Sequence, residues 1–159
     1  MNSENELRSD LEAELFELLC SRGYKRAEEE PFRLASGKLS HHYFNGKEIV
    51  LTQRGMRAFA RWALLQRPFT ERPAPVAVGG MELGAVPMAA AIAALAPSDL
   101  DAFIVRKASK GYGTRRRIEG ALASGARVVV VEDVITTGGS TKQAIEVLEE
   151  AGAEVCGVV

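Results

Sequence analysis

Residues 127–144, RVVVVEDVITTGGSTKQA, decide how the rest of the chain is organised. They open with Val128 to Val131, and a continuous β-branched run of this kind is typical of a strand buried on both faces of a parallel sheet. The acidic pair Glu132-Asp133 comes next, followed by small and hydroxyl residues and then by a helical pattern that Gly152 ends. The stretch therefore predicts one strand–loop–helix unit with its polar residues at the carboxyl end of the strand.

The loop Thr136–Thr141 has the composition of a phosphate cradle. Glycines let the backbone approach a ligand, and the free N–H groups and dipole of a helix N-terminus favour an anion. Carboxylates just before such a loop can accept hydrogen bonds from a ribose diol. The sequence contains neither the Gly-Lys-Ser/Thr of a Walker loop nor G-x-G-x-x-G. A plain turn with Gly and Thr is the alternative, and the acidic pair favours a sugar phosphate.

The overall composition is that of an ordinary globular domain. The chain has 159 residues, of which 47% are hydrophobic and 26% charged, enough for one domain with its own core. No apolar run approaches a membrane span, and the start MNSENELRSD lacks the features of a signal peptide, so we expect a cytoplasmic protein without a membrane partner. Cys20 and Cys156 have no disulfide or metal spacing and are expected as free thiols.

Charge is unevenly distributed along the chain. Residues 106–117, RKASKGYGTRRR, hold six of the 20 basic residues and no acid, so the remainder carries 14 basic against 21 acidic residues, a net charge of −7. A charge run is usually a solvated face. A basic island on an acidic protein indicates a local polyanion site and argues against a nucleic-acid surface, which would need broader positive charge.

The N-terminal third predicts two helices with strands between them. Periodic leucines indicate an amphipathic helix over Glu6–Arg22, and Thr52 is placed to cap a helix over Gln53–Gln66. The segment between them, 32–51, reads as strands with turns at Ser36-Gly37-Lys38 and at Asn45-Gly46. His41 and His42 are the only histidines. Neighbours on a strand point to opposite faces, which argues against a shared metal.

Three more apolar strands are expected, at residues 76–78, 101–106 and 154–159. The first is followed by the glycine-rich Gly79–Gly84 and an apolar helix over residues 86–95, and RPFTERPAP before it reads as a connecting loop. Repeated units of this kind indicate an α/β fold with a doubly wound, mainly parallel sheet flanked by helices. Ligands bind at the carboxyl ends of such strands, where the loops 79–84, 106–113 and 132–141 all fall.

The motif VVVVEDVITTGGST resembles the ribose-5-phosphate signature of the type I phosphoribosyltransferases. The resemblance implies that Glu132 and Asp133 hold the ribose hydroxyls of 5-phosphoribosyl 1-pyrophosphate (PRPP). It implies that the 5-phosphate is held by the loop residues Thr136, Thr137, Gly138, Gly139 and Ser140. It also implies the type I phosphoribosyltransferase fold, with a core over residues 52–159 and an N-terminal helix and hood over residues 1–51. Mg²⁺ is the implied cofactor, held mainly by PRPP and not directly by protein ligands.

Residues 32–43 resemble the hood of orotate phosphoribosyltransferases, F-x-L-x-S-G-x-x-S-x-x-Y. The matching positions are Phe32, Leu34, Ser36, Gly37, Ser40 and Tyr43. The resemblance implies that the hood covers the base and that the base pocket is formed by Ser36, Gly37, Tyr43 and Phe44. Many members have lysine before the Ser-Gly pair, where this chain has Ala35, so that contact is not carried over.

The basic island resembles the catalytic loop of the same family, R-K-x-x-K-x-x-G…I-E-G. The resemblance places Arg106, Lys107 and Lys110 on the pyrophosphate and makes Lys110 and Asp133 the catalytic residues. Tyr112 stands where members usually have histidine, and tyrosine cannot supply a proton near neutral pH as histidine does. In the family this loop reaches the neighbouring subunit, so the resemblance implies a homodimer that shares the loop Arg106–Gly113.

The second glycine-rich loop resembles the pyrophosphate loop of these enzymes. Its residues are Gly80, Met81, Glu82, Leu83 and Gly84. Related enzymes often place a lysine there, whereas Glu82 supplies no cation, so backbone N–H groups would hold the anion. A plain helix start is the alternative interpretation of this segment.

Together these resemblances imply transfer of the 5-phosphoribosyl group from PRPP to orotate, giving orotidine 5′-monophosphate and pyrophosphate in pyrimidine biosynthesis. A transferase for another base and a non-catalytic PRPP-binding regulator stay open. Family members usually continue with an Asp-Arg-containing loop, whose arginine contacts the base carboxylate, then more sheet and a final helix. Those segments are not in this sequence.

Overall fold

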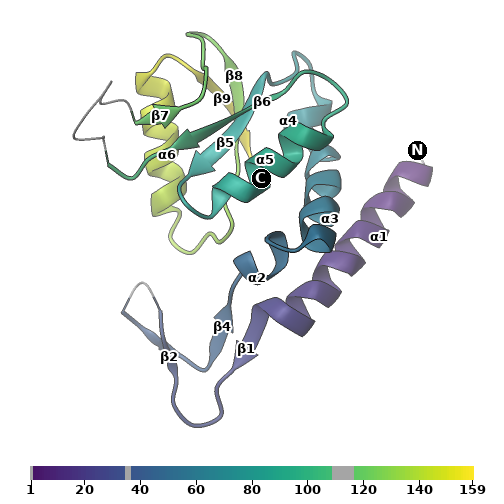
Figure 1. Cartoon of the computed structure of the whole chain (residues 1–159), viewed down its shortest axis with the longest axis vertical. Coiled ribbons are helices and arrows are strands. Elements are labelled where there is room, and N and C mark those ends of the chain that lie inside the picture. The colour runs from purple at the N-terminus through teal and green to yellow at the C-terminus, as the bar shows by residue number, and fades with distance from the viewer. Residues whose placement is uncertain (1, 35–36, 109–116) are drawn as a thin grey trace.

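The computed structural model describes residues 2–34, 37–108 and 117–159 (Figure 1). A sheet flanked by helices forms one end of the molecule, and a smaller segment with short strands extends from it. The N-terminal helix runs along the outside. The expected Ser36, Lys110 and Tyr112 lie outside the described residues. None of the described helices is long and apolar enough to cross a membrane.

The N-terminal helix α1 covers Asn2–Leu18 and continues into the π-helical turn η1, Leu19–Gly23. The helix expected over residues 6–22 is therefore confirmed, and it begins four residues earlier. Leu11 and Leu18 are buried on its inner side, against α3. Gly23 ends the turn where a Cβ would lie 2.9 Å from the end of the Ile49 side chain, so a side chain there would force Ile49 to shift.

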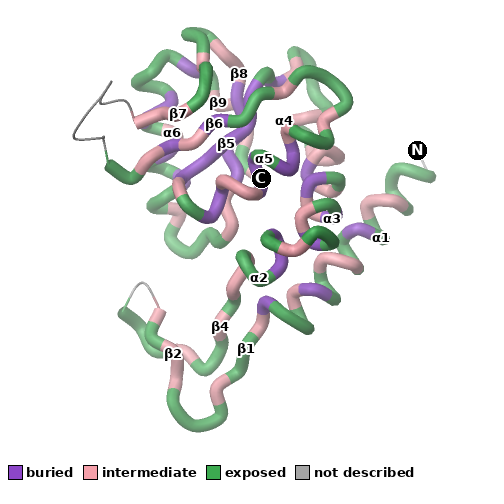
Figure 2. The backbone as a smooth tube through the Cα atoms, in the orientation of Figure 1, coloured by how far each residue is buried: buried purple, intermediate pink, exposed green. Residues whose placement is uncertain are grey.

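Two small antiparallel pairs follow and form the hood segment. Strand β1 (Tyr24–Arg26) pairs with β4 (His42–Phe44), and β2 (Phe32–Arg33) pairs with β3 (Leu39–Ser40). Figure 2 shows that this segment is mostly exposed or half-buried, whereas buried residues concentrate in the central strands and helices of the sheet domain. Exposed hydrogen bonds and few buried contacts give such a segment low local stability.

The interpretation of Lys47–Leu51 as a strand is wrong. The structure places the short helix α2 over Lys47–Val50, directly after the Asn45-Gly46 turn. Ile49 and Val50 are buried, so α2 packs as part of the domain core. The apolar run Ile-Val is too short for its period to distinguish a helix turn from a strand.

Helix α3 covers Gln53–Leu64, and the Thr52 hydroxyl accepts a hydrogen bond from the Gly55 N–H at 3.0 Å. The expected N-cap is thus confirmed. Residues 67–75 were expected as a loop, but Arg67–Thr70 form the short helix α4, with Pro68 in its first turn. Proline is accepted there because the first N–H groups of a helix have no intrahelical partner.

The five-stranded sheet has the order β7-β6-β5-β8-β9. Strands β6 (Asp101–Val105), β5 (Ala77–Met81), β8 (Arg127–Val130) and β9 (Glu154–Val158) are parallel, and β7 (Ile118–Glu119) is antiparallel at one edge. Helix α5 (Ala85–Leu95) connects β5 to β6, and α6 (Gly139–Glu150) connects β8 to β9. The doubly wound, mainly parallel sheet predicted from the sequence is confirmed.

Alternate residues of the central strands enter two separate cores. Val129 and Val131 pack with α3 and α5, whereas Val128 and Val130 pack with α6 and with Phe103 of β6. All four valines are fully buried, and each such burial contributes roughly 1.5–3 kcal/mol. The β-branched run is continuous because both faces of this strand are covered by helices.

Gly79 and Gly80 are part of strand β5, which extends further than the expected residues 76–78. A Cβ at Gly79 would overlap the Phe103 ring and carbonyl, and one at Gly80 would overlap the Val131 carbonyl. These glycines therefore let β5 pack closely between β6 and β8. The turn that follows the strand is shorter than the expected Gly79–Gly84 and consists of Glu82, Leu83 and Gly84.

Candidate active site

The acidic pair lies where β8 ends, between the sheet and the N-terminus of α6. The Glu132 N–H donates to the Val159 carbonyl at 3.2 Å, and the Thr141 hydroxyl lies 3.4 Å from Glu132 Oε2. Burial, followed by the neighbouring charge of Asp133, raises the pKa of Glu132 above its usual value. A half-buried carboxyl that holds its proton more tightly than usual is thus placed beside an ionisable neighbour.

The loop after the acidic pair turns sharply into α6. Gly138 adopts the left-handed conformation, with φ of 75°, and a Cβ there would meet no atom within 4 Å. Helix α6 then begins at Gly139, and Thr141 is buried in its first turn. Thr136, Thr137, Gly139 and Ser140 are exposed. The helix N-terminus is therefore open to a ligand on the side of the hydroxyl-bearing loop.

Asp133 is enclosed by two glycines from separate segments. Its side chain is 12% exposed. A Cβ at Gly84 would overlap the Asp133 carboxylate, and one at Gly46 would lie 3.2 Å from the Asp133 carbonyl oxygen. The second glycine-rich turn and the end of the hood segment thus both meet the acidic pair.

Lys47 completes this enclosure and was not expected from the sequence. Its Nζ lies 2.9 Å from Asp133 Oδ2 across 86 positions of the chain. Lys47 was assigned from the sequence to a strand next to a turn. No local sequence pattern at that position predicts an ion pair with a residue after β8. Only the folded chain brings the first residue of α2 to the end of β8.

Glu82 joins the second glycine-rich turn to the start of the basic segment. Its Oε1 accepts a hydrogen bond from the Lys107 N–H at 2.9 Å, and its Oε2 lies 3.8 Å from Arg106 Nη1. The same Nη1 lies 3.7 Å from Glu119 Oε1. The Glu82 N–H donates to the Val105 carbonyl at 2.8 Å. The acidic side chain that stands in place of a cation therefore holds the backbone at the end of β6.

The two ends of the basic segment lie side by side. The Arg106 N–H donates to the Arg117 carbonyl at 2.7 Å, and the Arg117 guanidinium donates to the Arg106 carbonyl at 3.1 and 3.2 Å. A third hydrogen bond from Arg117 reaches the Lys107 carbonyl at 3.3 Å. Lys107 itself is exposed. Both flanks of this segment are thus fixed to the sheet edge next to Glu82.

The hood aromatics pack on one another. Tyr43 lies against Phe32 with ring centroids 5.4 Å apart, and Phe44 lies against Tyr24 at 5.2 Å, with about half of its surface exposed. Gly37 adopts the left-handed conformation, with φ of 81°. Strand β4, which carries both expected base-pocket aromatics, leads within three residues to Lys47 and hence to Asp133.

The two histidines have separate partners, and only His42 lies in a strand, because His41 forms the bend between β3 and β4. His41 Nδ1 lies 3.0 Å from the Ala27 carbonyl, and His42 Nδ1 lies 2.7 Å from the Tyr24 hydroxyl. Among residues 2–34, 37–108 and 117–159, no group of three or more His, Cys, Asp or Glu side chains could hold a metal ion. The carboxylates nearest the expected sugar site are Glu132 and Asp133, whose oxygens are the donor type that Mg²⁺ prefers.

A cavity of about 390 Å³ opens beside the acidic pair. Glu132, Asp133 and Gly46 form one part of its wall, and mostly apolar side chains from α1, α2, α3 and α5, together with Glu12, form the rest. The apolar lining includes Leu15, Phe16, Ile49, Phe59, Trp62 and Met88.

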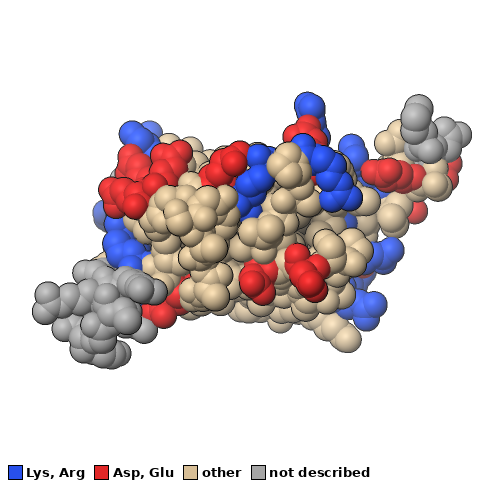
Figure 3. Space-filling view, turned by 90° about the horizontal axis from the view of Figure 1, so that it is seen from above, with Lys and Arg blue, Asp and Glu red and all other residues tan. Residues whose placement is uncertain are grey.

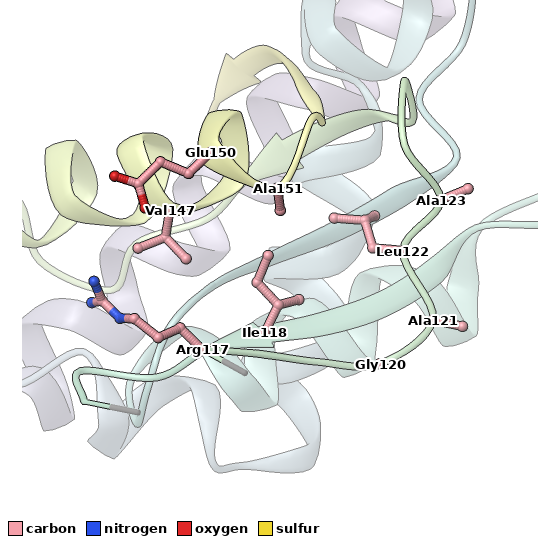
Figure 4. A pocket seen from close by; sticks show the side chains of 9 residues that line it. All are labelled: Arg117, Ile118, Gly120, Ala121, Leu122, Ala123, Val147, Glu150 and Ala151. Carbon is pink, nitrogen blue, oxygen red and sulfur yellow. The ribbon is translucent and has the colours of Figure 1, made fainter. Parts of the chain in front are cut away.

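A second cavity, of about 750 Å³, lies between α6 and the segment around β7 (Figure 4). The side chains of Ile118, Leu122 and Val147 point toward its interior, with Arg117 and Glu150 at its side. It contains none of the residues expected to bind PRPP or a base. The polar loops of the candidate site lie elsewhere, at the ends of β5, β6 and β8.

One face of the described part of the molecule carries charged side chains of both signs. Viewed from above, much of the visible face is uncharged, and both basic and acidic side chains lie along its edges (Figure 3). A nucleic-acid surface would concentrate one sign over a wide area. No such concentration is visible on this face.

Comparison with known proteins places this arrangement in a family. Residues 45–159 match the model of the phosphoribosyl transferase domain. The orotate phosphoribosyltransferase of Thermosynechococcus vestitus is 44% identical over 98% of this chain and 82% of the relative. That of Aquifex aeolicus is 42% identical over 91% of this chain and 79% of the relative.

Solved structures agree with the sequence relatives. A Mycobacterium tuberculosis orotate phosphoribosyltransferase in complex with Fe(III) dicitrate superposes with a TM-score of 0.77 and 36% identity, covering 92% of this chain and 80% of that one. The same enzyme in complex with PRPP superposes with a TM-score of 0.72 and 35% identity, covering 92% of this chain and 78% of that one. The fold, the motif at the end of β8 and these relatives together show that the chain belongs to the orotate phosphoribosyltransferase family.

Proposed function

We propose that this chain transfers the 5-phosphoribosyl group from PRPP to orotate, releasing pyrophosphate and forming orotidine 5′-monophosphate for pyrimidine biosynthesis. The observation that carries the proposal is the placement of Glu132 and Asp133 directly before the loop at the N-terminus of α6. An acidic pair that can bind the ribose diol is therefore followed along the chain by a helix end that can bind its phosphate. The relatives, and the M. tuberculosis enzyme in complex with PRPP, support this assignment.

The sugar phosphate is assigned to the loop and the acidic pair. Thr136, Thr137, Gly138, Gly139 and Ser140 hold the 5-phosphate, because their hydroxyls and the N–H groups of the helix end can donate to it. Glu132 and Asp133 accept hydrogen bonds from the ribose hydroxyls. The Thr141 hydroxyl donates to Glu132 Oε2 at 3.4 Å and restricts the orientation of that carboxyl.

The reaction breaks the bond between the anomeric carbon and pyrophosphate while a base nitrogen forms a new bond to that carbon. The sugar develops oxocarbenium character, and negative charge grows on the leaving pyrophosphate. Mg²⁺ held mainly by PRPP would neutralise charge on the pyrophosphate, and Glu132 and Asp133 are the carboxylates that could contact it on the sugar side. Asp133, with its negative charge beside the ribose, favours positive charge on the sugar.

Cations of the basic segment are assigned to the departing pyrophosphate. Lys107 projects from the end of β6, where Glu82 fixes its backbone N–H. Arg106 contributes a second cation, and Lys110, outside the described residues, is assigned as the catalytic cation. The turn Glu82–Gly84 lies next to this group, and with Gly80 and Met81 it forms the proposed pyrophosphate side of the site.

The hood is assigned to the base. Tyr43 and Phe44 supply aromatic surface, and Ser36 and Gly37 complete the proposed base pocket. The division into a hood over residues 1–51 and a core over residues 52–159 stays a prediction. So does the homodimer in which loop 106–113 is shared between subunits, and so does a cytoplasmic location.

The deciding experiment measures pyrophosphate release from PRPP with orotate, with and without Mg²⁺. We expect release that requires both. Release with hypoxanthine or adenine in place of orotate would assign the chain to another base. Binding of PRPP with no release in the presence of any base would assign it as a PRPP-binding regulator.

A further inference from the structure

We propose that Lys47 is a positioning residue that orients the Asp133 carboxylate for the ribose diol and ties the hood to the sugar site. The inference rests on the proposed function, because it concerns how the same site holds PRPP. It adds a residue outside the acidic pair, the phosphate loop and the basic segment. Lys47 acts through Asp133 and does not itself contact the substrate.

The geometry that carries the inference is a close ion pair between distant segments. Lys47 Nζ lies 2.9 Å from Asp133 Oδ2, the length of a charge-assisted hydrogen bond. The Asp133 side chain is 12% exposed, whereas that of Lys47 is 47% exposed. A pair with one nearly buried partner is screened less by water than a pair on the open surface. Its loss would leave a nearly buried carboxylate without its cation.

The ion pair leaves Asp133 able to bind a sugar. An ionised carboxylate has two oxygens and can accept several hydrogen bonds. Lys47 engages Oδ2, and Gly84 packs against the carboxylate from the second glycine-rich turn. The rotation of the carboxylate is thereby restricted before a ligand arrives. Restricting a binding group in advance reduces the entropy lost when the ligand binds.

The same ion pair also reduces repulsion within the acidic pair. Glu132 and Asp133 are adjacent, and the charge of Asp133 is one cause of the raised pKa of Glu132. A cation at 2.9 Å offsets part of the negative charge that the pair concentrates at the end of β8. Lys47 therefore places a positive charge beside two adjacent carboxyl groups.

The position of Lys47 links this effect to the hood. It is the first residue of α2, three positions after Phe44 of β4. Asn45, between them, donates its N–H to the Gly23 carbonyl at 2.8 Å, and a Cβ at Gly46 would lie 3.2 Å from the Asp133 carbonyl oxygen. The chain that carries the base-side aromatics is thus held against the ribose-side carboxylate at two adjacent residues.

The test compares Lys47→Met and Lys47→Arg with a matched control, Arg67→Met. Arg67 forms an exposed ion pair with Glu71. Its substitution therefore removes one positive charge from an ion pair away from the candidate site. Dissociation constants are measured for ribose 5-phosphate, which carries the diol, and for inorganic phosphate, which does not. PRPP kinetics with orotate are measured alongside, and thermal melting reports whether each variant folds.

We expect Lys47→Met to weaken the binding of ribose 5-phosphate about tenfold. This loss lies between those expected for removing an exposed and a buried ion pair. Inorganic phosphate should bind as in the wild type, because the loop at α6 is untouched. Lys47→Arg should recover most of the ribose 5-phosphate affinity, and Arg67→Met should match the wild type. In an Asp133→Asn background, Lys47→Met should add little, since residues that act through one contact are not additive.

Equal weakening of both ligands by Lys47→Met, or no weakening of either, would overturn the role of Lys47. So would full additivity with Asp133→Asn. If Lys47→Met does not fold, Lys47→Gln, which also removes the positive charge, replaces it in both the ligand comparison and the Asp133→Asn cycle. Failure of the proposed function looks different, because the wild type would then bind ribose 5-phosphate but release no pyrophosphate with orotate.

Discussion

Gly84 and Asp133 lie so close that a Cβ on the glycine would overlap the carboxylate of the aspartate. Gly84 precedes α5 and Asp133 follows β8, so the contact joins two of the loops at the carboxyl edge of the sheet. The backbone of Gly84 is right-handed helical, with φ of −64° and ψ of −41°, and any residue can adopt it. Its small size is therefore required by the neighbouring carboxylate and not by the backbone.

Gly84→Ala tests this relationship. We expect the variant to fold, because alanine favours the start of α5, but to displace Asp133 and weaken PRPP binding about tenfold or more. Calorimetric titration with PRPP measures the effect, and circular dichroism on melting checks the fold. Wild-type affinity in a folded Gly84→Ala variant would show that Asp133 can move without loss of binding.

Glu82 is expected to act by holding the backbone of Lys107. Glu82→Gln keeps an oxygen acceptor for the Lys107 N–H, whereas Glu82→Ala removes it. Loss of one such hydrogen bond costs about 1 kcal/mol, so pyrophosphate release by Glu82→Ala should be several-fold slower at low PRPP than by Glu82→Gln. Steady-state kinetics of both variants measure this difference. Equal rates for the two variants would contradict the anchoring role.

Glu132 should make stability depend on pH in a specific direction. Its pKa is raised in the folded protein above the ordinary value of 4.5, chiefly by burial. The folded state therefore disfavours the ionised carboxyl, and this penalty is present above the folded pKa and disappears as the pH falls below 4.5. Glu132→Gln should be more stable than the wild type at pH 7 and equal to it in acid.

Urea unfolding of the wild type and Glu132→Gln at a series of pH values measures the free energy of unfolding. The same substitution should weaken the binding of PRPP, because an amide replaces a carboxylate that accepts hydrogen bonds from the ribose diol. A stability gain for Glu132→Gln that persisted unchanged below pH 4.5 would contradict the burial of an ionised group as its cause.

Lys110 and Asp133 are expected to affect different steps. Asp133→Asn should mainly weaken PRPP binding, whereas Lys110→Ala should slow turnover by about a hundredfold, the range for removing one group that stabilises charge in a transition state. Single-turnover kinetics at saturating PRPP separate the two effects. An unchanged rate in Lys110→Ala would show that the basic segment supplies its catalytic cation from another residue.

Local patterns in the sequence predicted the elements that build the site. The valine run at 128–131 predicts a strand covered on both faces, and the Thr52 hydroxyl predicts the cap of α3. Both are decided within a few residues, by burial on each face of the strand and by the unpaired N–H groups of a helix end. The family resemblance was equally local, because its motif follows the strand, loop and helix in order.

Other features depended on residues far apart in the chain. Lys47 was assigned to a strand and proved to begin a helix that reaches Asp133, and Glu82 proved to hold the backbone of Lys107. Sequence by itself determined that a strand, an acidic pair and a helix N-terminus would form one site. The tertiary structure alone decided which side chains from other segments complete it, because such contacts depend on how separate elements pack and not on the period of any one of them.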